Sequence, residues 1–367
     1  MDRVRILVVN AGSSSLKLRV VGDADDVLGT EDLGPVDGLS DDDLSRALDK
    51  LGGFDAVGHR IVHGGERYRE PVVVDEAVRA ELGALADLAP LHQPNSLTAL
   101  DAVTRLAPDV PAVACFDTAF HATLPPAAAT YAVPVAWRDG LHVRRYGFHG
   151  LSHAYAARRA TAAIGHPARL VTCHLGAGAS LAAVHDGRCV DTTMGFTPLE
   201  GLVMATRSGT VDPGAVLWLI THRGLEPQAV ADTLEHQSGL LALAGTADMA
   251  AVADAFRRGE PAATLALDVY VHRLRAAIAA MVAGLGGLDA LVFTGGVGEN
   301  APTVRAAAAA GLGFLGVALD ARRNDEAVGA AAAPEADLTA EGSTVRTLVV
   351  PAREDLEIAR GVRARLR

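Results

Sequence analysis

Polar side chains and a glycine turn follow an apolar segment close to residue 10. Ile6–Val9 has the character of a buried strand, and Asn10–Lys17 then supplies an amide, a glycine, three hydroxyls and a lysine. Backbone amides freed by such a turn, together with hydroxyls and one cation, are suited to hold a polyphosphate. Lys17 is one of only two lysines among 33 basic residues, which indicates that a compact point charge is wanted there. A plain hairpin turn is the alternative interpretation of this segment.

Three further clusters place a charged side chain beside a glycine turn or at the end of a predicted strand. Arg60 ends one apolar segment, Asp117 directly follows another, and Arg207 lies among hydroxyls and glycines. An arginine in a turn of this composition is suited to bind an oxyanion. Structural alternatives exist for two of them, since a surface ion pair would explain Arg60 and a helix N-cap would explain Asp117.

A glycine-rich turn and a pair of histidines complete the candidate residues. Gly295–Asn300 follows an apolar strand and enters a helix, which is the placement expected of a nucleotide-binding loop. His149 and His153 lie four residues apart, so a zinc hydrolase is an alternative function. Gly150 replaces the glutamate of the usual zinc motif, and a helix would only begin there, which argues against that function.

The charge and composition argue against several kinds of partner. The net charge is −11 with histidine neutral, which disfavours nucleic acid or an anionic membrane as the main partner. Cys115, Cys173 and Cys189 have no Cys-x-x-Cys spacing and are expected to be reduced core residues of a cytoplasmic protein. The charged residues near the start do not resemble a signal peptide. The longest uncharged apolar run, Ala276–Leu288, is about a third shorter than a membrane span and predicts a buried helix.

Strands and helices are predicted to alternate along the chain, which indicates an α/β fold. Apolar segments predict strands at Ile6–Val9, Ala56–Val62, Ala112–Phe116, Leu170–His174 and Ala290–Thr294. Helical patterns cover Ser152–Ile164, Ala263–Leu285 and Asp355–Leu366. The strand–turn–strand pattern near residue 10 is repeated at Leu170–Leu181, so we infer a duplication into two similar lobes. The boundary is expected near Phe120–Pro126, with a ligand bound between the lobes.

Eight motifs of the chain follow one another in the order known from one enzyme family. They are Asn10–Lys17, Gly58–Glu66, Phe116–His121, Tyr146–His153, Gly195–Gly201, Thr206–Gly209, Thr294–Asn300 and Glu354–Leu356. On these motifs, and over nearly its full length, the chain resembles the acetokinase family of the sugar kinase, heat-shock-protein and actin superfamily. The resemblance implies two duplicated actin-like (ribonuclease H-like) lobes with the active site in the cleft between them. It also implies an N-terminal lobe of residues 1–119 plus 356–367 and a C-terminal lobe of residues 120–355, which carries the nucleotide loops and the dimer interface.

The same resemblance implies a reaction. A homodimer would transfer the γ-phosphoryl group of ATP reversibly to the carboxylate of acetate, giving acetyl phosphate and ADP, with Mg²⁺ as the metal and Mn²⁺ as its substitute. An acceptor carboxylate is already ionised at pH 7 and needs no general base, so Asp117 is expected to position the metal or its waters. Two arginines, a histidine and the metal can stabilise the equatorial oxygens of the transferred group.

The family's functional residues carry over position by position. Asn10 and Glu354 match metal-linked positions, Arg60 matches the arginine that binds the substrate carboxylate, and Asp117 matches the catalytic aspartate. His149 and Arg207 match the residues that stabilise the transition state. The acetate methyl group is expected to be enclosed by Val62, Leu91, Phe148 and Pro198. The nucleotide positions are Lys17, His174, Leu175, Gly176, Ala177, Gly178, Asp248, Met249, Gly296, Val297, Gly298, Glu299 and Asn300.

Two departures from the family pattern fall on the nucleotide side. Ala177 stands where the second loop usually has asparagine, and Ala250 stands where an arginine usually follows Asp248-Met249. Because each change removes a polar contact, another phosphoryl donor such as pyrophosphate is an alternative, although the intact Gly295–Asn300 loop favours an adenine nucleotide.

A propionate or other short-chain acyl kinase is an alternative on the acyl side, because one methylene changes affinity little. A nucleotide-binding module without catalysis is disfavoured, since the acyl-side arginines, aspartate and histidine are all present.

Overall fold

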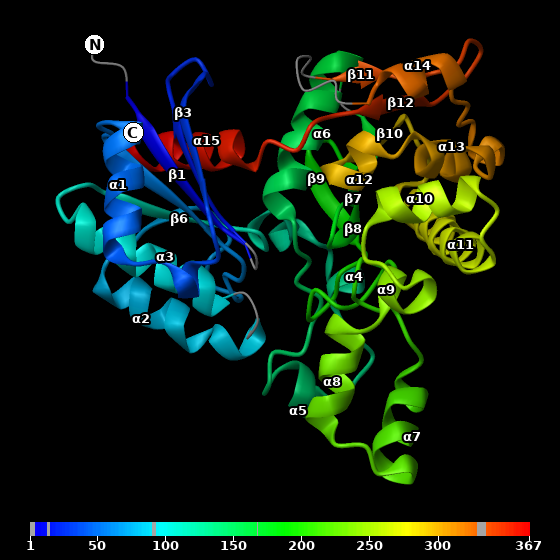
Figure 1. Cartoon of the computed structure of the whole chain (residues 1–367), viewed down its shortest axis with the longest axis horizontal. Coiled ribbons are helices and arrows are strands. Elements are labelled where there is room, and N and C mark those ends of the chain that lie inside the picture. The colour runs from blue at the N-terminus through cyan, green and yellow to red at the C-terminus, as the bar shows by residue number, and fades with distance from the viewer. Residues whose placement is uncertain (1–3, 13–14, 90–92, 167, 329–334) are drawn as a thin grey trace. The chain divides into compact units, whose positions relative to one another are not determined.

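The computed structural model describes residues 4–12, 15–89, 93–166, 168–328 and 335–367. They form two compact units (Figure 1). Unit 1 comprises Met1–Ala122, Phe148–Tyr155 and Arg353–Arg367, and unit 2 comprises Thr123–Gly147 and Ala156–Ala352. The segment Phe148–Tyr155 therefore belongs with unit 1, although the chain on both sides of it belongs to unit 2.

Unit 1 is built on a six-stranded mixed sheet. Its strand order is β3 (Val27–Leu33), β2 (Leu16–Val21), β1 (Ile6–Ala11), β4 (Ala56–Ile61), β6 (Ala112–Phe116) and β5 (Val72–Val73). Strands β1, β4 and β6 are parallel, whereas β2, β3 and β5 each pair antiparallel to a neighbour. Because the carboxyl ends of parallel strands meet at one edge of a sheet, the residues that end β1, β4 and β6 come together there.

Unit 2 repeats this sheet strand for strand. Its order is β9 (Arg188–Thr192), β8 (Ala179–His185), β7 (Arg169–Leu175), β10 (Ala290–Thr294), β12 (Arg346–Val349) and β11 (Ala336–Asp337). The central strands β7, β10 and β12 are parallel, and the other three pair antiparallel, as in unit 1. The duplication inferred from the repeated strand–turn–strand pattern is thus confirmed as a repeated topology, β1–β2 corresponding to β7–β8.

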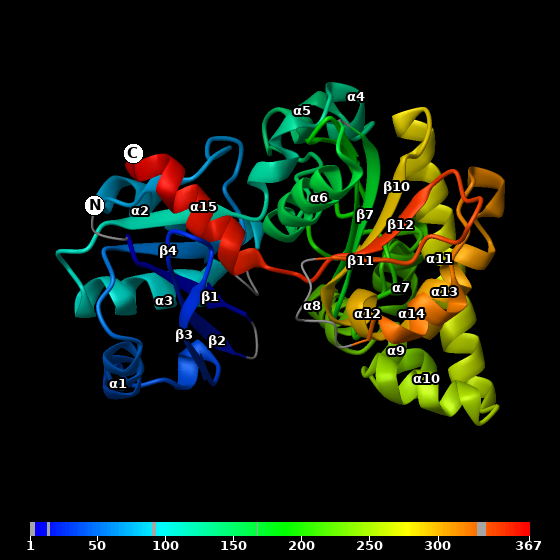
Figure 2. The ribbon, with the colours of Figure 1, turned by 90° about the horizontal axis from the view of Figure 1, so that it is seen from above.

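Helices cover the faces of the two sheets (Figures 1 and 2). Those that lie wholly in unit 1 are α1 (Asp41–Leu51), α2 (Glu76–Ala84), α3 (Gln93–Leu106) and α15 (Glu354–Leu366), with 3₁₀ turns at Val36–Gly38 and Ala86–Leu88. A further 3₁₀ turn, Ala119–Thr123, has its last residue in unit 2. Helix α6 (Gly150–Ile164) begins in unit 1 and ends in unit 2. Those of unit 2 are α4 (Pro126–Ala129), α5 (Val135–Arg138), α7 (Pro213–Arg223), α8 (Pro227–His236), α9 (Gly239–Ala244), α10 (Met249–Arg257), α11 (Pro261–Leu285), α12 (Gly295–Asn300), α13 (Pro302–Ala310) and α14 (Ala321–Glu326), with a 3₁₀ turn at Gly313–Leu315.

The elements predicted from the apolar pattern are confirmed to within about two residues at each end. The apolar run predicted to form a buried helix, Ala276–Leu288, is helical as far as Leu285, where α11 ends, and Gly286 then stops the helix in the left-handed conformation. This part of α11 buries Ile278, Met281 and Val282, and the helix packs on β8. Among the described residues one stretch, 239–257, is long and apolar enough to cross a membrane. It is divided between α9 and α10, and Gly245 ends α9 in the left-handed conformation.

Candidate active site

Two of the predicted catalytic residues and the two predicted metal-linked residues form one hydrogen-bonded cluster in unit 1. Arg60 at the end of β4 donates from Nη2 to Asp117 Oδ2 at 2.6 Å and from Nη1 to Asn10 Oδ1 at 3.2 Å. Asn10 in β1 donates from Nδ2 to Glu354 Oε2 at 2.8 Å, across 344 positions of sequence. Glu354 also lies 3.9 Å from Arg60 Nη1. An amide, an arginine and two carboxylates thus converge at the carboxyl edge of the parallel strands.

Asp117 is held in place through its backbone. Its N–H donates to the carbonyl of Ile61 at 3.0 Å, and its carbonyl accepts from the N–H of Gly150 at 2.9 Å. A Cβ at position 150 would lie 2.1 Å from the Asp117 carbonyl oxygen, so only glycine allows α6 to start this close. These contacts fix the ends of β4, β6 and α6 at one point and explain why residues 148–155 cluster with unit 1.

Burial and charge set the ionisation of the cluster. The Asp117 side chain is 1% exposed, and burial raises its pKa while the Arg60 guanidinium opposes that rise. Burial also disfavours the charge on Arg60, but Asp117 and Glu354 outweigh it and raise the Arg60 pKa. Arg60 is therefore a permanent cation that one further anion, such as a substrate carboxylate, could contact.

The donor atoms of this cluster fit a magnesium ion. Mg²⁺ prefers oxygen ligands and is usually bound by one or two carboxylates together with substrate phosphates and waters. Asp117, Glu354 and the side-chain amide oxygen of Asn10 are donors of this kind, and all three lie within 4 Å of the Arg60 guanidinium. Within the described residues no three histidine, cysteine, aspartate or glutamate side chains are grouped to hold a metal by themselves.

His149 lies directly before α6 in a strained conformation. Its φ angle is +57°, the left-handed region that a residue with a Cβ seldom adopts. The neighbouring Phe148 is 1% exposed, its carbonyl lies 2.9 Å from Nε2 of His121, and its ring meets that of His63 edge-on. The backbone conformation at His149 is thus fixed by contacts on both sides, which is typical of a residue positioned for function.

The predicted acyl-pocket residues are only partly assembled within one unit. Val62 and Phe148 are both buried in unit 1, whereas Pro198 belongs to unit 2. Leu91 lies outside the described residues. Pro198 does contact another candidate residue, because its carbonyl accepts a hydrogen bond of 3.3 Å from Arg207 Nη1.

Arg207 occupies a tight loop of unit 2. Its carbonyl accepts from the N–H of Met204, and the loop is held against α9 by the bond from Leu240 N–H to the Met204 carbonyl. Burial lowers the Arg207 pKa, and Glu235 only partly opposes this effect. A buried guanidinium of this kind would be stabilised by an anionic ligand.

Seven of the predicted nucleotide residues line one pocket of unit 2, which has a volume of about 530 Å³. They are Gly176, Ala177, Asp248, Met249, Gly296, Val297 and Asn300. They come from the β7–β8 turn, the start of α10 and α12. Asp248 caps α10 by accepting from the N–H of Ala250 at 2.9 Å, so its carboxylate also has a structural role.

The other predicted nucleotide residues do not line this pocket. Lys17 is exposed on β2 in unit 1, opposite Asn10 in the β1–β2 ladder. Leu175 is fully buried, and Glu299 accepts from the backbone N–H of Ala352 at 2.9 Å. His174, Gly178 and Gly298 flank the loops without lining the pocket.

Several residues that line the pocket carried no signal in the sequence. Leu240 comes from α9, Tyr270 from the middle of α11, and Val328 from the segment just after α14. Their positions in the chain are far apart, and only the packing of α9, α10 and α11 brings them together. No pattern in the sequence could have identified them.

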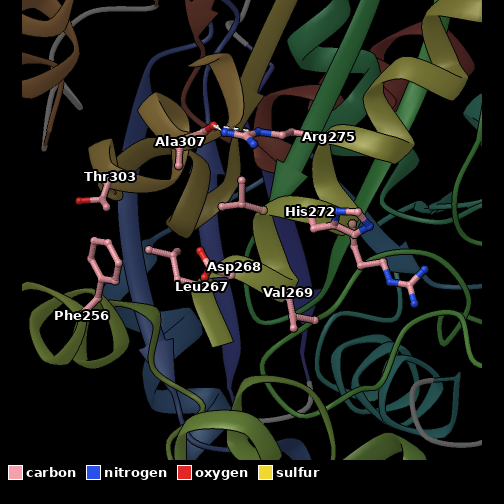
Figure 3. Close-up of a pocket in the computed structure, with 10 residues that line it drawn as sticks. Phe256, Leu267, Asp268, Val269, His272, Arg275, Thr303 and Ala307 are labelled. Atoms are coloured by element: carbon pink, nitrogen blue, oxygen red, sulfur yellow. Dashed lines mark hydrogen bonds between the residues drawn. The ribbon is translucent and has the colours of Figure 1, made fainter. Parts of the chain in front are cut away.

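A second pocket of unit 2, with a volume of about 620 Å³, contains none of the predicted residues. It lies along α11 and α13 (Figure 3), where Arg275 Nε donates to the Ala307 carbonyl at 3.0 Å. Asp268 and His272, which line it, are exposed side chains.

The fold and the site define the class of protein before any comparison. Two α/β units of identical strand order, one with a carboxylate–arginine cluster and the other with a glycine-lined pocket, are typical of an actin-like two-lobed protein. The sequence profile of the acetokinase family matches residues 36–360, and the chain belongs to this family.

Individual relatives agree with this assignment. The acetate kinase of Leifsonia xyli subsp. xyli is 45% identical over 390 aligned positions, covering 97% of each chain. The crystal structure of Porphyromonas gingivalis acetate kinase matches with a TM-score of 0.89 and 34% identity, over 99% of this chain and all of that chain. A propionate kinase from Francisella tularensis subsp. tularensis matches with a TM-score of 0.90 and 33% identity, over 98% of each chain. The overall fold therefore does not distinguish specificity for acetate from specificity for propionate.

Proposed function

We propose that this protein is an acetate kinase, which transfers the γ-phosphoryl group of ATP to acetate and forms acetyl phosphate and ADP reversibly. The observation that carries the proposal is the Asn10–Arg60–Asp117–Glu354 cluster in a chain of the acetokinase family. This set of side chains supplies what the acyl side needs, namely a cation for the acceptor carboxylate and oxygen donors for a metal.

The acceptor needs positioning more than activation. The acetate carboxylate is ionised at neutral pH, so it attacks without loss of a proton. Arg60 would bind one carboxylate oxygen, with Val62 and Phe148 against the methyl group. Asp117, Glu354 and Asn10 would hold Mg²⁺, which when bound neutralises the charge of the phosphates.

His149 and Arg207 would stabilise the charge that develops on the transferred group. The phosphoryl group passes through a loose transition state whose charge lies on three equatorial oxygens. The left-handed backbone fixes His149, and burial makes Arg207 a cation that gains most from an added anion. Donors held in advance in this way stabilise the transition state at no cost of reorganisation.

ATP is the proposed phosphoryl donor. Most of the unit 2 pocket is lined by apolar side chains, including Leu240, Met249 and Val297, and by glycines. Its charged side chains are two aspartates and one arginine, Asp248, Asp254 and Arg257. Apolar walls of this kind suit a nucleoside, whereas pyrophosphate would need charged side chains in their place. Ala177 and Ala250, which stand where the family usually has asparagine and arginine, weaken the binding of a nucleotide in this pocket but add no positive charge to it.

The decisive experiment measures acyl phosphate as its hydroxamate. The purified protein is assayed with acetate, propionate and butyrate, each with ATP, GTP and pyrophosphate as donor. We expect product with ATP and acetate, and a smaller kcat/KM with propionate by about tenfold, since one methylene is worth about 1–3 kcal/mol. A preference for pyrophosphate would overturn the donor, and a preference for propionate would change the acyl specificity. Absence of product with every pair would overturn the function.

We further propose that the enzyme is a cytoplasmic homodimer. Helix α7 buries none of its residues within the chain, although it is apolar, and Leu217 and Trp218 are 61% and 46% exposed. Helix α7 lies beside α8 in unit 2 (Figure 1), and Val211 and Leu225 extend the apolar surface at its two ends. An exposed apolar surface of this kind is typical of a subunit interface. The three cysteines are free and buried, as expected in a reducing compartment.

A further inference from the structure

We propose that the phenolic hydroxyl of Tyr270 donates a hydrogen bond to the nucleotide in the unit 2 pocket. The inference deepens the proposed function and rests on it, because it names a further nucleotide-binding residue of the same site. Neither the sequence motifs nor the family resemblance pointed to Tyr270, which lies in the middle of α11.

The side chain of Tyr270 is buried at the wall of the pocket. Tyr270 is 3% exposed, and it lines the same pocket as Gly176, Ala177 and Gly296. Within the described part of the chain, its hydroxyl oxygen has no hydrogen-bond partner. Helix α11, which carries Tyr270, packs against β7 and β8, the two strands joined by the turn that carries Gly176 and Ala177. The side chain of Tyr270 therefore lies in the same pocket wall as that turn.

A buried hydroxyl without a partner is unfavourable. Burial removes its bonds to water, so nearly all such groups in folded proteins are paired. Burial also raises the Tyr270 pKa, so the hydroxyl keeps its proton and can act as a donor. The ribose, the base and the phosphates of a nucleotide all offer acceptors, and a ligand in this pocket would supply the missing partner.

The charged and amide side chains around the pocket already have contacts within the protein. Asp248 caps α10, Asn300 donates to the Gly296 carbonyl at 3.0 Å, and Asp254 pairs with Arg257. Ala177 and Ala250 contribute no polar group. In this chain Ala177 replaces the asparagine that the family usually has in the β7–β8 turn. A buried phenol that can still donate a hydrogen bond therefore contributes more to nucleotide affinity here than it would beside that asparagine.

The test compares Tyr270→Phe with the wild-type enzyme by calorimetric titration with ADP in the presence of Mg²⁺, and with adenosine alone. Tyr270→Phe removes one oxygen and keeps the ring. Thr347→Val is the matched control, because the Thr347 hydroxyl is also buried and has no partner in the described chain but does not line the pocket. Thermal unfolding of the ligand-free proteins is measured alongside.

We expect the ADP dissociation constant of Tyr270→Phe to rise about tenfold, the change expected for one lost hydrogen bond. The midpoint of unfolding without ligand should stay the same or rise, and Thr347→Val should bind ADP as the wild type does. A parallel loss of adenosine affinity would place the bond at the nucleoside, and its retention would place the bond at the phosphates. Unchanged ADP affinity would overturn the inference.

The unfolding measurement separates nucleotide binding from a purely structural role of the phenol. If ligand-free Tyr270→Phe unfolds at a lower temperature than the wild type, and the lost unfolding free energy equals the lost free energy of ADP binding, the phenol has a structural role. That result would overturn the inference. If the wild type binds ADP but forms no acyl phosphate, the proposed function fails, whereas the comparison of ADP affinities still decides the role of Tyr270.

Discussion

At the scale of single residues, the buried pair of Arg60 and Asp117 determines the chemistry of unit 1. Replacing Asp117 by Asn leaves Arg60 without its closest anion and removes a charged metal ligand. We expect Asp117→Asn to lose about 3–5 kcal/mol of unfolding free energy and to need a much higher Mg²⁺ concentration for activity. Urea unfolding and a magnesium titration of the rate measure the two effects. Loss of turnover with an unchanged magnesium requirement would contradict the metal-positioning role.

Arg207 is expected to act on the transition state rather than on substrate binding. Lysine keeps the charge but not the planar fork that contacts two oxygens at once. We therefore expect Arg207→Lys to lower kcat by about 100-fold or more while the KM values for ATP and acetate change little. Steady-state kinetics decide this, and a change confined to KM would refute a transition-state role.

The buried side chain of His59 makes the stability of the folded protein depend on pH. Its ring is 1% exposed, neither ring nitrogen has a partner among the described residues, and burial lowers its pKa to about 3. The unfolded chain takes up a proton near pH 6.5 and the folded chain does not, so stability falls as the pH drops from about 6.5 toward 3. We expect His59→Leu to reduce that dependence by about 1.4 kcal/mol per pH unit without loss at pH 8. Urea unfolding from pH 8 to pH 4.5 measures it, and an unchanged slope would contradict the assignment.

At the scale of elements, the approach of α15 to β4 sets the position of Glu354. A Cβ on Gly58 would lie 2.6 Å from Ile358 Cγ2 and 2.7 Å from Val362 Cγ2, so β4 and α15 touch through this glycine. We expect Gly58→Ala to push α15 outward, to cost about 1–3 kcal/mol of stability and to raise the magnesium requirement, since Glu354 begins that helix.

The control for Gly58→Ala is another glycine of unit 1. A Cβ on Gly34 would meet nothing within 4 Å, so Gly34→Ala should change neither stability nor magnesium dependence appreciably. If the two variants behaved alike, the close packing at Gly58 would not be what places Glu354.

At the scale of the whole molecule, the exposed apolar residues of α7 predict association. A charge in the centre of an apolar interface must be desolvated without a partner, so we expect Trp218→Glu to give a monomer in sedimentation velocity. Phe314→Glu, at a residue that is 76% exposed on another part of unit 2, should leave the dimer intact. A dimer that survives Trp218→Glu would exclude this face as the interface.

Much of the candidate site could be predicted because its residues lie at the ends of parallel strands. Asn10, Arg60 and Asp117 follow apolar segments in β1, β4 and β6, and the rule that such ends meet brings them together. The duplication was also visible, because β1–β2 and β7–β8 share one pattern of apolar segment, turn and apolar segment. Periodicity and turn chemistry are local properties, and a single sequence records them directly.

The amino-acid sequence by itself determined the family, the strands and most of the residues that end them, because those depend on local pattern and residue type. Only the tertiary structure decided which distant groups touch. Glu354 reaches Asn10 because α15 packs against Gly58, and the left-handed backbone of His149 follows from contacts on both sides. The unpartnered hydroxyl of Tyr270 depends on the packing of α11 against β7 and β8. Such contacts arise from the three-dimensional packing of side chains, which no local pattern specifies.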